Sequence, residues 1–390
     1  MRILVLGGAG KMGCIAVQTL AHDDRVDEVI IADINMAQAE IVAAAIGSSK
    51  LRLQQVDIRD ADAFVATLRG ADACLNATVY YTNLTVMAAC RQAGVPYVDL
   101  GGLFHTTRKQ LELDGEFRQA GVPAVLGMGS APGIPNVQAR YAADRLDAIA
   151  SIRIYDGIKP PPPGSDLFTY AVPTILDELT LSPMVFRHGA FSECAPLSEF
   201  EEYAFAAPLG VLPMHLSLHS EVATLPITYA HKGVQEVFFK INYWGMSPET
   251  VARVRVLADF GLNSRQPVAV RGQHVAPRDL LMELLADRVP PITEFLRPPA
   301  HQPPDWVKEI VTETRGVKEG QALTYRVGTL TVKGALPTGA APAVAAIWLA
   351  EGRIPPGVHA PEHVLDPEPF FAELARLGIP TQVSVSQMLA

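Results

Sequence analysis

The residues near the start of the chain have the types and spacing needed to bind a diphosphate group. Three glycines form a G-x-G-x-x-G pattern, and an aspartate follows about 20 residues further on. The first glycine permits a tight turn, the second lets the backbone approach a pyrophosphate, and the third lets a helix pack closely on a strand. The N–H groups at the start of that helix attract phosphate oxygens, and the aspartate is placed to bind an adenosine ribose. The predicted contact residues are Gly8, Gly10, Lys11, Met12, Gly13 and Asp33.

Asp99, which lies between apolar residues and a Gly-Gly pair, is the first candidate for a catalytic group. A carboxylate at this position is able to hold a cationic amine or to accept its proton. The alternative is a carboxylate that only caps a turn. Tyr80 and Asn83 face a similar choice between pocket wall and ligand, and Tyr80 and His105 are the next candidates for catalysis.

Two pairs of residues four positions apart suggest other chemistry. Tyr155 and Lys159 match the Tyr-x-x-x-Lys pair of short-chain dehydrogenases, which requires both side chains on one helical face. Tyr155 lies in a strand pattern and Lys159 precedes four prolines, so we do not expect a helix there. His215 and His219, with Glu221 nearby, would suit zinc on a helix. Their segment alternates like a strand or loop, so we expect no metal and interpret one of the two histidines as a substrate-pocket residue.

Alternating strands and helices are predicted to position the N-terminal residues. Strand patterns occur at residues 2–6, 29–32, 52–56, 73–77, 96–100 and 123–126. Helical segments lie between them at residues 14–20, 36–45, 61–68, 84–93 and 107–119. This alternation indicates an α/β fold with a doubly wound, parallel Rossmann sheet, on which ligands bind beyond the carboxyl ends of the strands. These ends add to the predicted cofactor contacts Asp57, Ile58, Asn76, Ala77 and Thr78.

The pattern changes after residue 135, where polar and apolar residues alternate as in antiparallel strands. Strand patterns lie at residues 151–155, 234–241 and 323–327, a polyproline loop at 159–164, and a helix at 279–285. We therefore expect an inserted mixed α/β domain, containing a largely antiparallel sheet, at residues 136–335. The Rossmann domain is expected at residues 1–135, with a C-terminal return at residues 336–390 that begins with a close-packing helix.

The composition limits the possible partners. With 390 residues and 49% hydrophobic residues, the chain is long enough for two domains with a buried core. A formal net charge of −9 argues against a nucleic-acid or anionic-membrane partner. The four cysteines have neither a metal-binding spacing nor a disulfide pattern. No apolar run spans a bilayer and no signal peptide precedes the first strand, so we expect a cytoplasmic protein.

Several motifs in a fixed order resemble those of the saccharopine dehydrogenase superfamily, and are most similar to the L-lysine 6-dehydrogenase branch. The resemblance runs over nearly the whole chain. It rests on the motifs at residues 6–13, 76–80, 94–102, 131–136, 187–189, 196–199 and 275–281. The resemblance implies a Rossmann domain with an inserted mixed domain, a homodimer formed through that domain, and hydride transfer at a carbon bonded to nitrogen. It also adds to the predicted cofactor contacts Ala131, Pro132 and Gly133.

Two departures from the family pattern bear on the substrate. Saccharopine reductases carry an aspartate where this chain has Ala131, which argues against saccharopine itself. Family members usually carry an arginine, and then a histidine or phenylalanine, where this chain has Asn242 and Met246. The usual amino-acid substrate is therefore in question.

From these observations we expect an NAD(P)-dependent oxidoreductase that acts on an amine or amino acid, as L-lysine 6-dehydrogenase does. NAD is expected in preference to NADP, because Asp33 would repel a 2′-phosphate and no Lys or Arg follows it before Lys50. One alternative is a saccharopine- or opine-type dehydrogenase that reduces an imine. The alternative of another class is a non-catalytic NAD-binding redox sensor.

Overall fold

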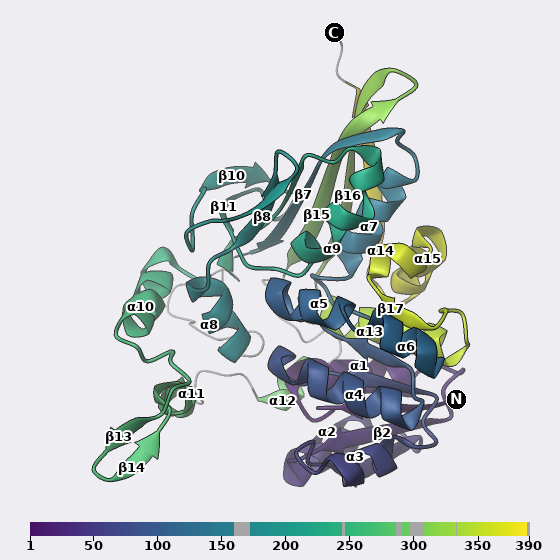
Figure 1. Ribbon diagram of the computed structural model, residues 1–390, viewed down its shortest axis with the longest axis vertical. Helices are drawn as coiled ribbons and strands as arrows, with labels where there is room; N and C mark the ends of the chain where they lie inside the picture. Colours follow the sequence, from purple (N-terminus) through teal and green to yellow (C-terminus); the bar gives the residue numbers. More distant parts are fainter. Residues whose placement is uncertain (160–171, 244–245, 286–290, 297–306, 333, 388–390) are drawn as a thin grey trace.

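Two sheets, one at each end of the molecule, are joined by a layer of helices (Figure 1). The computed structural model describes residues 1–159, 172–243, 246–285, 291–296, 307–332 and 334–387. The prolines of the predicted polyproline loop, and Trp244 and Gly245 of the motif that departs from the family, lie outside the described residues.

The N-terminal sheet is parallel and has seven strands in the order β17-β6-β5-β4-β1-β2-β3. The strands are β1 Arg2–Leu6, β2 Glu28–Asp33, β3 Leu51–Gln55, β4 Ala73–Asn76, β5 Tyr97–Asp99, β6 Pro123–Val125 and β17 Gly357–His359. Strand order reverses between β1 and β4, and this is the point at which dinucleotides bind to doubly wound sheets. The predicted Rossmann sheet is therefore confirmed.

The helices of this sheet follow the predicted alternation, with one correction. They are α1 Lys11–Ala21, α2 Met36–Ile46, α3 Ala61–Leu68, α4 Asn83–Ala93, α5 Leu103–Leu111 and α6 Asp114–Ala120. The single helix predicted at residues 107–119 was wrong, because the chain breaks into α5 and α6. The α5 helix packs against the second domain, whereas α6 packs on β6 and β17, and one straight helix would not reach both surfaces.

The second sheet has nine strands and is mixed. Its main path is β10-β11-β12-β7-β15-β16-β18, and β8 and β9 attach beside β12. The strands are β7 Ala148–Ile158, β8 Met184–Arg187, β9 Ala190–Glu193, β10 Glu201–Ala204, β11 Val211–Leu216, β12 Glu236–Ile241, β15 Lys308–Lys318, β16 Gln321–Thr331 and β18 Thr381–Gln387. Among the described strands of this sheet, only β7 and β12 pair in parallel, and the other neighbours pair antiparallel, as predicted.

The helices of the second domain divide into two groups. The first group is α7 Ile134–Ala143 and α9 Glu221–Thr228, which pack on strands of the second sheet, and α8 Val172–Thr180. A second group, which we call the arm, extends from the body of the molecule (Figure 1). The arm consists of α10 Pro248–Asp259, β13 Val268–Val270, β14 Gln273–Val275 and α11 Pro277–Leu285. After it, the short helix α12 Ile292–Phe295 returns to contact α1 and α2.

The C-terminal residues complete both sheets. Helix α13 Leu336–Ala350 packs against α1 in the core, and β17 extends the parallel sheet. Helices α14 Pro361–Val364 and α15 Pro367–Arg376 follow, and β18 then pairs with β16 of the second sheet. The return predicted for residues 336–390 is thus shared between the two sheets, and the domain limits themselves stay a prediction.

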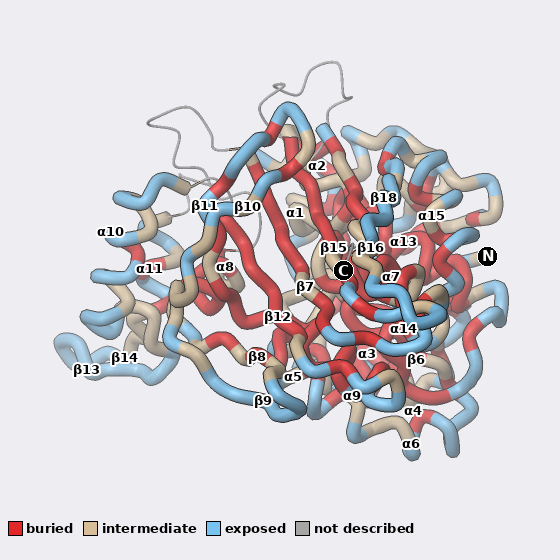
Figure 2. Tube along the Cα trace, turned by 90° about the horizontal axis from the view of Figure 1, so that it is seen from above, coloured by how far each residue is buried: buried red, intermediate tan, exposed pale blue. Residues whose placement is uncertain are grey.

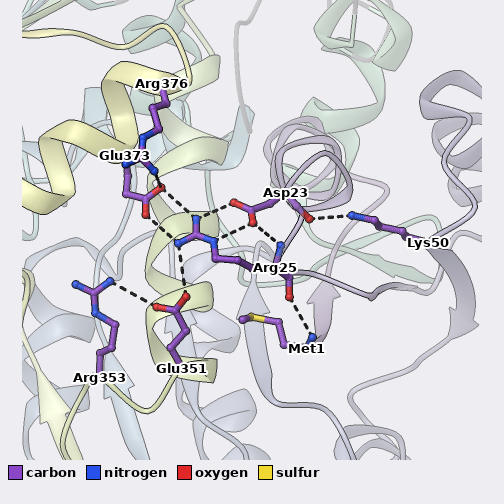
Figure 3. Close-up of polar contacts among 8 residues, drawn as sticks. All are labelled: Met1, Asp23, Arg25, Lys50, Glu351, Arg353, Glu373 and Arg376. Atoms are coloured by element: carbon purple, nitrogen blue, oxygen red, sulfur yellow. Dashed lines mark hydrogen bonds and ion pairs between the residues drawn. The ribbon is translucent and has the colours of Figure 1, made fainter.

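A cluster of charged residues joins the loop between α1 and β2 to this C-terminal return (Figure 3). The Arg25 guanidinium lies 2.7 Å from the Asp23 carboxylate, 2.8 Å from that of Glu373 and 3.5 Å from that of Glu351. The Lys50 ammonium donates to the Asp23 carbonyl over 2.8 Å. Several charges in one network stabilise the contact between this loop and the return more than isolated surface ion pairs would.

Buried residues are concentrated in the central strands of both sheets and in α13, whereas the arm and β18 are mostly exposed (Figure 2). Three of the four cysteines are buried, and all four are free thiols. Among the described residues, no helix is long and apolar enough to cross a membrane.

Candidate active site

The glycine pattern forms a tight loop between β1 and α1. Gly8 lies in the turn that the Gly10 N–H closes on the Gly7 carbonyl at 2.9 Å, and Gly7 before it takes the left-handed conformation (φ 73°). A Cβ on Gly8 would lie 2.9 Å from the Val5 carbonyl oxygen of β1. The loop is therefore too close to the strand for any side chain at this position. A Cβ on Gly13 would lie 2.1 Å from the Gly7 carbonyl oxygen. The close approach predicted for the third glycine is therefore confirmed.

The first turn of α1 carries a lysine in an unusual environment. Gly10 caps the helix, Lys11 is its first residue, and Met12 packs on the core beside it. The Lys11 ammonium lies 5.5 Å from the centre of the Phe295 ring of α12. Burial lowers the pKa of Lys11 to about 8, because desolvation disfavours the charged form. A cation therefore stands at a helix start whose N–H groups already favour anions.

Asp33 is fixed against the glycine loop. Its Oδ2 accepts a hydrogen bond from the Ala9 N–H at 3.1 Å, and its Oδ1 accepts one from the Asn35 N–H at 3.0 Å. The Gln38 side chain donates to the Ala9 carbonyl at 2.9 Å. The carboxylate at the end of β2 is thus held beside the turn, as the predicted ribose contact requires.

Asn76, Ala77 and Thr78 lie next to the same turn. The Thr78 methyl group is 3.0 Å from the position that a Cβ on Gly7 would take. The Asn76 Oδ1 accepts from both the N–H and the hydroxyl of Thr78, at 3.1 and 2.6 Å. The end of β4 is therefore rigid and in contact with the glycine loop.

Asp57 and Ile58 follow β3 on the neighbouring rim. The Val56 N–H donates to the Asp33 carbonyl, so this segment runs directly beside the ribose-contact residue. Arg59 holds Asp57 in an exposed ion pair of 2.6 Å and lowers its pKa to about 2. Ile58 is partly buried against the Rossmann core.

These observations fit a bound dinucleotide. The loop has no room for a Cβ at Gly13, the helix start is cationic, and an acid stands at the end of the second strand. Gly8, Gly10 and Lys11 would hold the pyrophosphate and Asp33 the adenosine ribose. A nicotinamide cofactor bound by these residues would supply hydride chemistry at this rim.

Asp99 is placed at the end of β5, but its carboxylate points into a closed network. Its Oδ1 accepts from the N–H groups of Gly101 and Gly127, at 2.9 and 2.7 Å. Its Oδ2 accepts from the side chains of Asn83, Tyr97 and Gln110, at 3.2, 2.9 and 2.6 Å. Burial raises the pKa of this carboxyl, and the hydrogen bonds oppose that rise. The arrangement favours the structural role over the catalytic one.

The Ala131–Gly133 segment closes the rim beside β5. The Pro132 ring lies 2.8 Å from the position that a Cβ on Gly101 would take. Gly133 precedes α7, and its N–H donates to the Asn136 side chain at 3.0 Å. The second domain reaches the same place through Ser220, whose hydroxyl accepts from the Gly102 N–H at 3.3 Å. The residues on either side of Ser220 therefore lie close to the rim.

Those neighbours belong to a buried group that we call the acidic cluster. Its members are Asp156 of β7, Glu178 of α8, His219, Glu221 of α9 and Lys308 of β15, and each is at most 4% exposed. The His219 Nδ1 lies 2.6 Å from Glu221 Oε2, and its Nε2 lies 3.9 Å from Glu178 Oε1. The Lys308 ammonium is 2.9 Å from Asp156. Among the described residues, Glu221 Oε1 has no hydrogen-bond partner.

The acidic cluster controls the charge of His219. Burial lowers the pKa of its imidazole, but Glu221, Glu178 and Asp156 outweigh burial and raise it above its usual value. The ring also stacks on Phe239, with centroids 3.7 Å apart. With three carboxylates, one lysine and one histidine, the cluster is formally anionic in either state of His219.

Tyr80, in the 3₁₀ turn η1 Tyr80–Thr82 after β4, belongs to a second polar group that we call the Tyr80 network. Its hydroxyl donates to Asp177 of α8 at 2.9 Å. Arg278 of α11 binds the same carboxylate through two nitrogens, at 2.7 and 3.1 Å. Arg265 of the arm lies 3.1 Å from it. Burial and the Asp177 charge raise the pKa of Tyr80 to about 12.

Other predicted residues lie elsewhere. His105 is exposed on α5, away from both groups just described. His215 is half-buried in β11, and His219 follows in a loop, which confirms the strand-or-loop prediction for this segment. Tyr155 lies inside β7 and Lys159 follows that strand, so the pair is not on a helix, as predicted.

Sequence patterns missed most of the charged residues that face the rim. Asp156 and Lys308 are fully buried charges, and no sequence pattern marked their burial. Glu178 and Arg265 lie in segments without a recognised motif, whereas Arg278 belongs to the motif at residues 275–281 but had no role assigned to it. Asn242, where the resemblance leads one to expect an arginine, exchanges two hydrogen bonds with the Ile158 backbone, at 3.0 and 2.6 Å.

Comparisons with known families cover nearly the whole chain. The model of the saccharopine dehydrogenase NADP binding domain matches residues 3–125. The model of the saccharopine dehydrogenase C-terminal domain matches residues 129–379.

Two curated relatives match at full length. The carboxyaminopropylagmatine dehydrogenase of Synechocystis is 26% identical over 407 aligned residues, with 97% of each chain covered. The carboxynorspermidine synthase of Vibrio cholerae is 25% identical, with 97% of this chain and 96% of the relative covered.

Two solved structures share the fold. Apo saccharopine dehydrogenase (L-Glu forming) from Saccharomyces cerevisiae superposes with a TM-score of 0.69 at 18% identity, covering 99% of both chains. Homospermidine synthase from Legionella pneumophila, in complex with NAD, superposes with a TM-score of 0.65 at 15% identity, covering 99% of this chain and 91% of the other. Both family models, the full-length relatives and the shared fold agree with the resemblance in the motifs. The chain therefore belongs to the saccharopine dehydrogenase family and is a nicotinamide-dependent dehydrogenase.

Proposed function

We propose that the protein transfers a hydride at a C–N bond of an amine that carries at least one further cationic group. The observation that supports this proposal is the acidic cluster beside the rim. A buried group of three carboxylates, two of which (Asp156 and Glu221) have an oxygen without a hydrogen-bond partner among the described residues, favours a cationic ligand. Lys308 offsets only part of that charge.

The reaction is reversible in principle. In oxidation, the carbon of the amine loses a hydride and the nitrogen loses a proton, which gives an imine that water opens. In the other direction, a carbonyl compound and an amine condense with loss of water, and the imine is reduced. His219, held by Glu221, is the group we assign to hold or move the proton, since the neighbouring carboxylates raise the pKa of its imidazole above the usual value and favour the protonated form.

The imine-reducing direction is the one we favour. The names of both curated relatives describe a polyamine-type chain that carries a carboxyl group, and one of them is a synthase. Such a product contains a secondary amine, which forms when an imine between two molecules is reduced. Oxidative deamination of L-lysine, which the motifs also suggest, is the second candidate.

The test is a survey of amines with the purified protein, following nicotinamide absorbance in both directions. We expect turnover with di- and triamines that carry an N-carboxyalkyl group, and little with L-lysine. Glu221→Gln should lower kcat/KM for these amines by about 100-fold or more, as loss of a buried charge partner and of the His219 pair implies. The matched control is Glu202→Gln, at an exposed carboxylate of β10. NAD binding without turnover of any amine would overturn the proposal.

We also propose that NAD is preferred over NADP. A 2′-phosphate on the adenosine ribose would face the Asp33 carboxylate, which is held beside the glycine loop. Two negative charges placed next to each other cost several kcal/mol of binding free energy. Arg59, a basic residue that follows β3, is held by Asp57. We expect kcat/KM for NAD to exceed that for NADP by about 100-fold, and Asp33→Ser to narrow the ratio. Equal use of both cofactors would contradict this prediction. The matched family model is named for NADP binding, so the measurement includes both cofactors.

A further inference from the structure

The Tyr80 network contains two guanidinium groups but only one carboxylate, that of Asp177. Arg278 is buried and binds both oxygens of Asp177, so this pair is neutral and complete by itself. Arg265 adds a second guanidinium on the open side of the pair, with 45% of its side chain exposed. The three charged groups together therefore carry a formal charge of +1.

Arg265 is also presented in a way that suits an anion. Among the described residues, its hydrogen bonds to Asp177 and Tyr80 all come from Nη2, at 3.1 and 3.5 Å. Its guanidinium lies 4.3 Å from the centre of the Tyr81 ring, and stacking of this kind fixes the plane of the group. Nε and Nη1 have no acceptor among the described residues, and because they lie on different edges of the guanidinium, each can donate one hydrogen bond to a carboxylate oxygen.

The position of Arg265 relates this charge to the acidic cluster. Helix α8 contributes Asp177 to the Tyr80 network and the next residue, Glu178, to the acidic cluster. Consecutive residues of a helix differ by about 1.5 Å in height and about 100° in direction. Opposite charges are thus presented on neighbouring sides of one helix, and both groups reach the rim, through Tyr80 after β4 and through Ser220 beside β5.

We infer that Arg265 binds a carboxylate of the substrate, while the acidic cluster holds its cationic end. The substrate is then a zwitterion in which a carboxylate and an ammonium group flank the reacting C–N bond. This inference rests on the proposed function and adds to it the residue that selects carboxylated amines.

The experiment uses two secondary amines that differ only in the carboxyl group of one arm, with the full-length protein and NAD. We expect the wild-type protein to prefer the carboxylated amine by about 10- to 100-fold in kcat/KM, the usual value of a charged hydrogen-bonded pair. Arg265→Gln should remove this preference by raising KM for the carboxylated amine, with kcat and the rate on the other amine nearly unchanged. Arg265→Lys keeps the positive charge but not the planar group of N–H donors. Its preference for the carboxylated amine should lie between those of the wild type and Arg265→Gln.

The matched control is Arg253→Gln, which removes the same charge from an exposed position of α10. It should leave both amines unaffected, and thermal unfolding should be unchanged in all variants because Arg265 is half exposed.

A preference for the carboxylated amine that survives in Arg265→Gln would overturn the inference, as would a wild-type protein that oxidises both amines equally. Both outcomes leave the proposed function intact. If neither amine is turned over, the proposed function fails, and calorimetric binding of the carboxylated amine to wild-type and Arg265→Gln protein still decides the role of Arg265.

Discussion

Asp99 shows how a residue in the predicted position can have a different task. Its sequence context and its place at the end of β5 match a catalytic carboxylate, yet five donors surround its two oxygens. The bonds to Gly101 and Gly127 join the chain after β5 to the chain after β6. Its carboxylate therefore holds the rim in shape.

The two roles of Asp99 predict different results for Asp99→Asn. An amide nitrogen in place of either oxygen would face N–H and O–H donors, and each lost bond costs about 1–3 kcal/mol. We expect a lower free energy of unfolding in urea, with kcat/KM of the folded protein reduced less than tenfold. A catalytic carboxylate would instead give normal stability with a loss of about 100-fold or more in kcat/KM.

Lys11 is expected to make binding of the nicotinamide cofactor depend on pH. Burial lowers its pKa to about 8 in the free protein, whereas a phosphate beside it would favour the charged form. Affinity should therefore be full below pH 8 and fall as the pH rises, by about fivefold between pH 8 and pH 9. Calorimetric titration with NAD measures this, and Lys11→Arg should bind well at both pH values. An affinity of the wild-type protein that does not change over this range would contradict the prediction.

At the residue scale, local patterns were sufficient only where the site itself is local. The glycine loop and Asp33 lie within one strand-helix-strand unit, so their spacing in the sequence reflects their spacing in space. The acidic cluster takes single residues from β7, α8, α9 and β15. No spacing rule links residues as distant as Asp156 and Lys308, and their partnership appears only after the sheet has formed.

At the scale of elements, α13 depends on close packing with α1. A Cβ on Gly339 would lie 2.6 Å from the Ile15 Cβ and 2.8 Å from the Ala16 backbone nitrogen. Gly339→Ala must therefore separate the two helices, and we expect it to lower the free energy of unfolding by about 1–3 kcal/mol.

The control for this change is Gly115→Ala in α6. A Cβ there meets no atom within 4 Å, so the variant should be as stable as the wild type or more stable by about 1 kcal/mol. Urea unfolding of both variants measures the difference. Equal stability of the two would show that α1 and α13 are not in tight contact.

Most elements were predictable because each strand and helix of the Rossmann unit has its own hydrophobic period. The errors arise where a tertiary partner decides the outcome. Helix α5 ends early because it and α6 cover different surfaces. Strand β18 has almost no buried residue, so its sequence carries no burial pattern, and only its pairing with β16 defines it.

At the scale of the whole molecule, the arm is the surface that a second copy of the chain is expected to cover. Large apolar side chains on it are exposed: Val256 at 51%, Phe260 at 82%, Val270 at 51% and Leu284 at 66%. Apolar patches of this kind mark interfaces, and a two-fold dimer covers the same residues on both chains.

We therefore expect a dimer in light scattering at micromolar protein, and a monomer after Phe260→Asp with Leu284→Asp. The control Val211→Asp places the same charge on an exposed residue of β11 and should remain dimeric. A wild-type monomer would refute the homodimer, and a double variant that stays dimeric would move the interface away from the arm.

The late position of α13 has a consequence for synthesis on the ribosome. The first six strands of the parallel sheet are complete by residue 125, but the helix that covers β4 and β5 beside α1 begins only at Leu336. At about 5–20 residues per second, the ribosome needs roughly 10–40 s to make the intervening chain. During that interval, the apolar surface that α13 will cover is exposed to water. The nascent Rossmann unit can therefore complete its core only after residues 336–350 have been made.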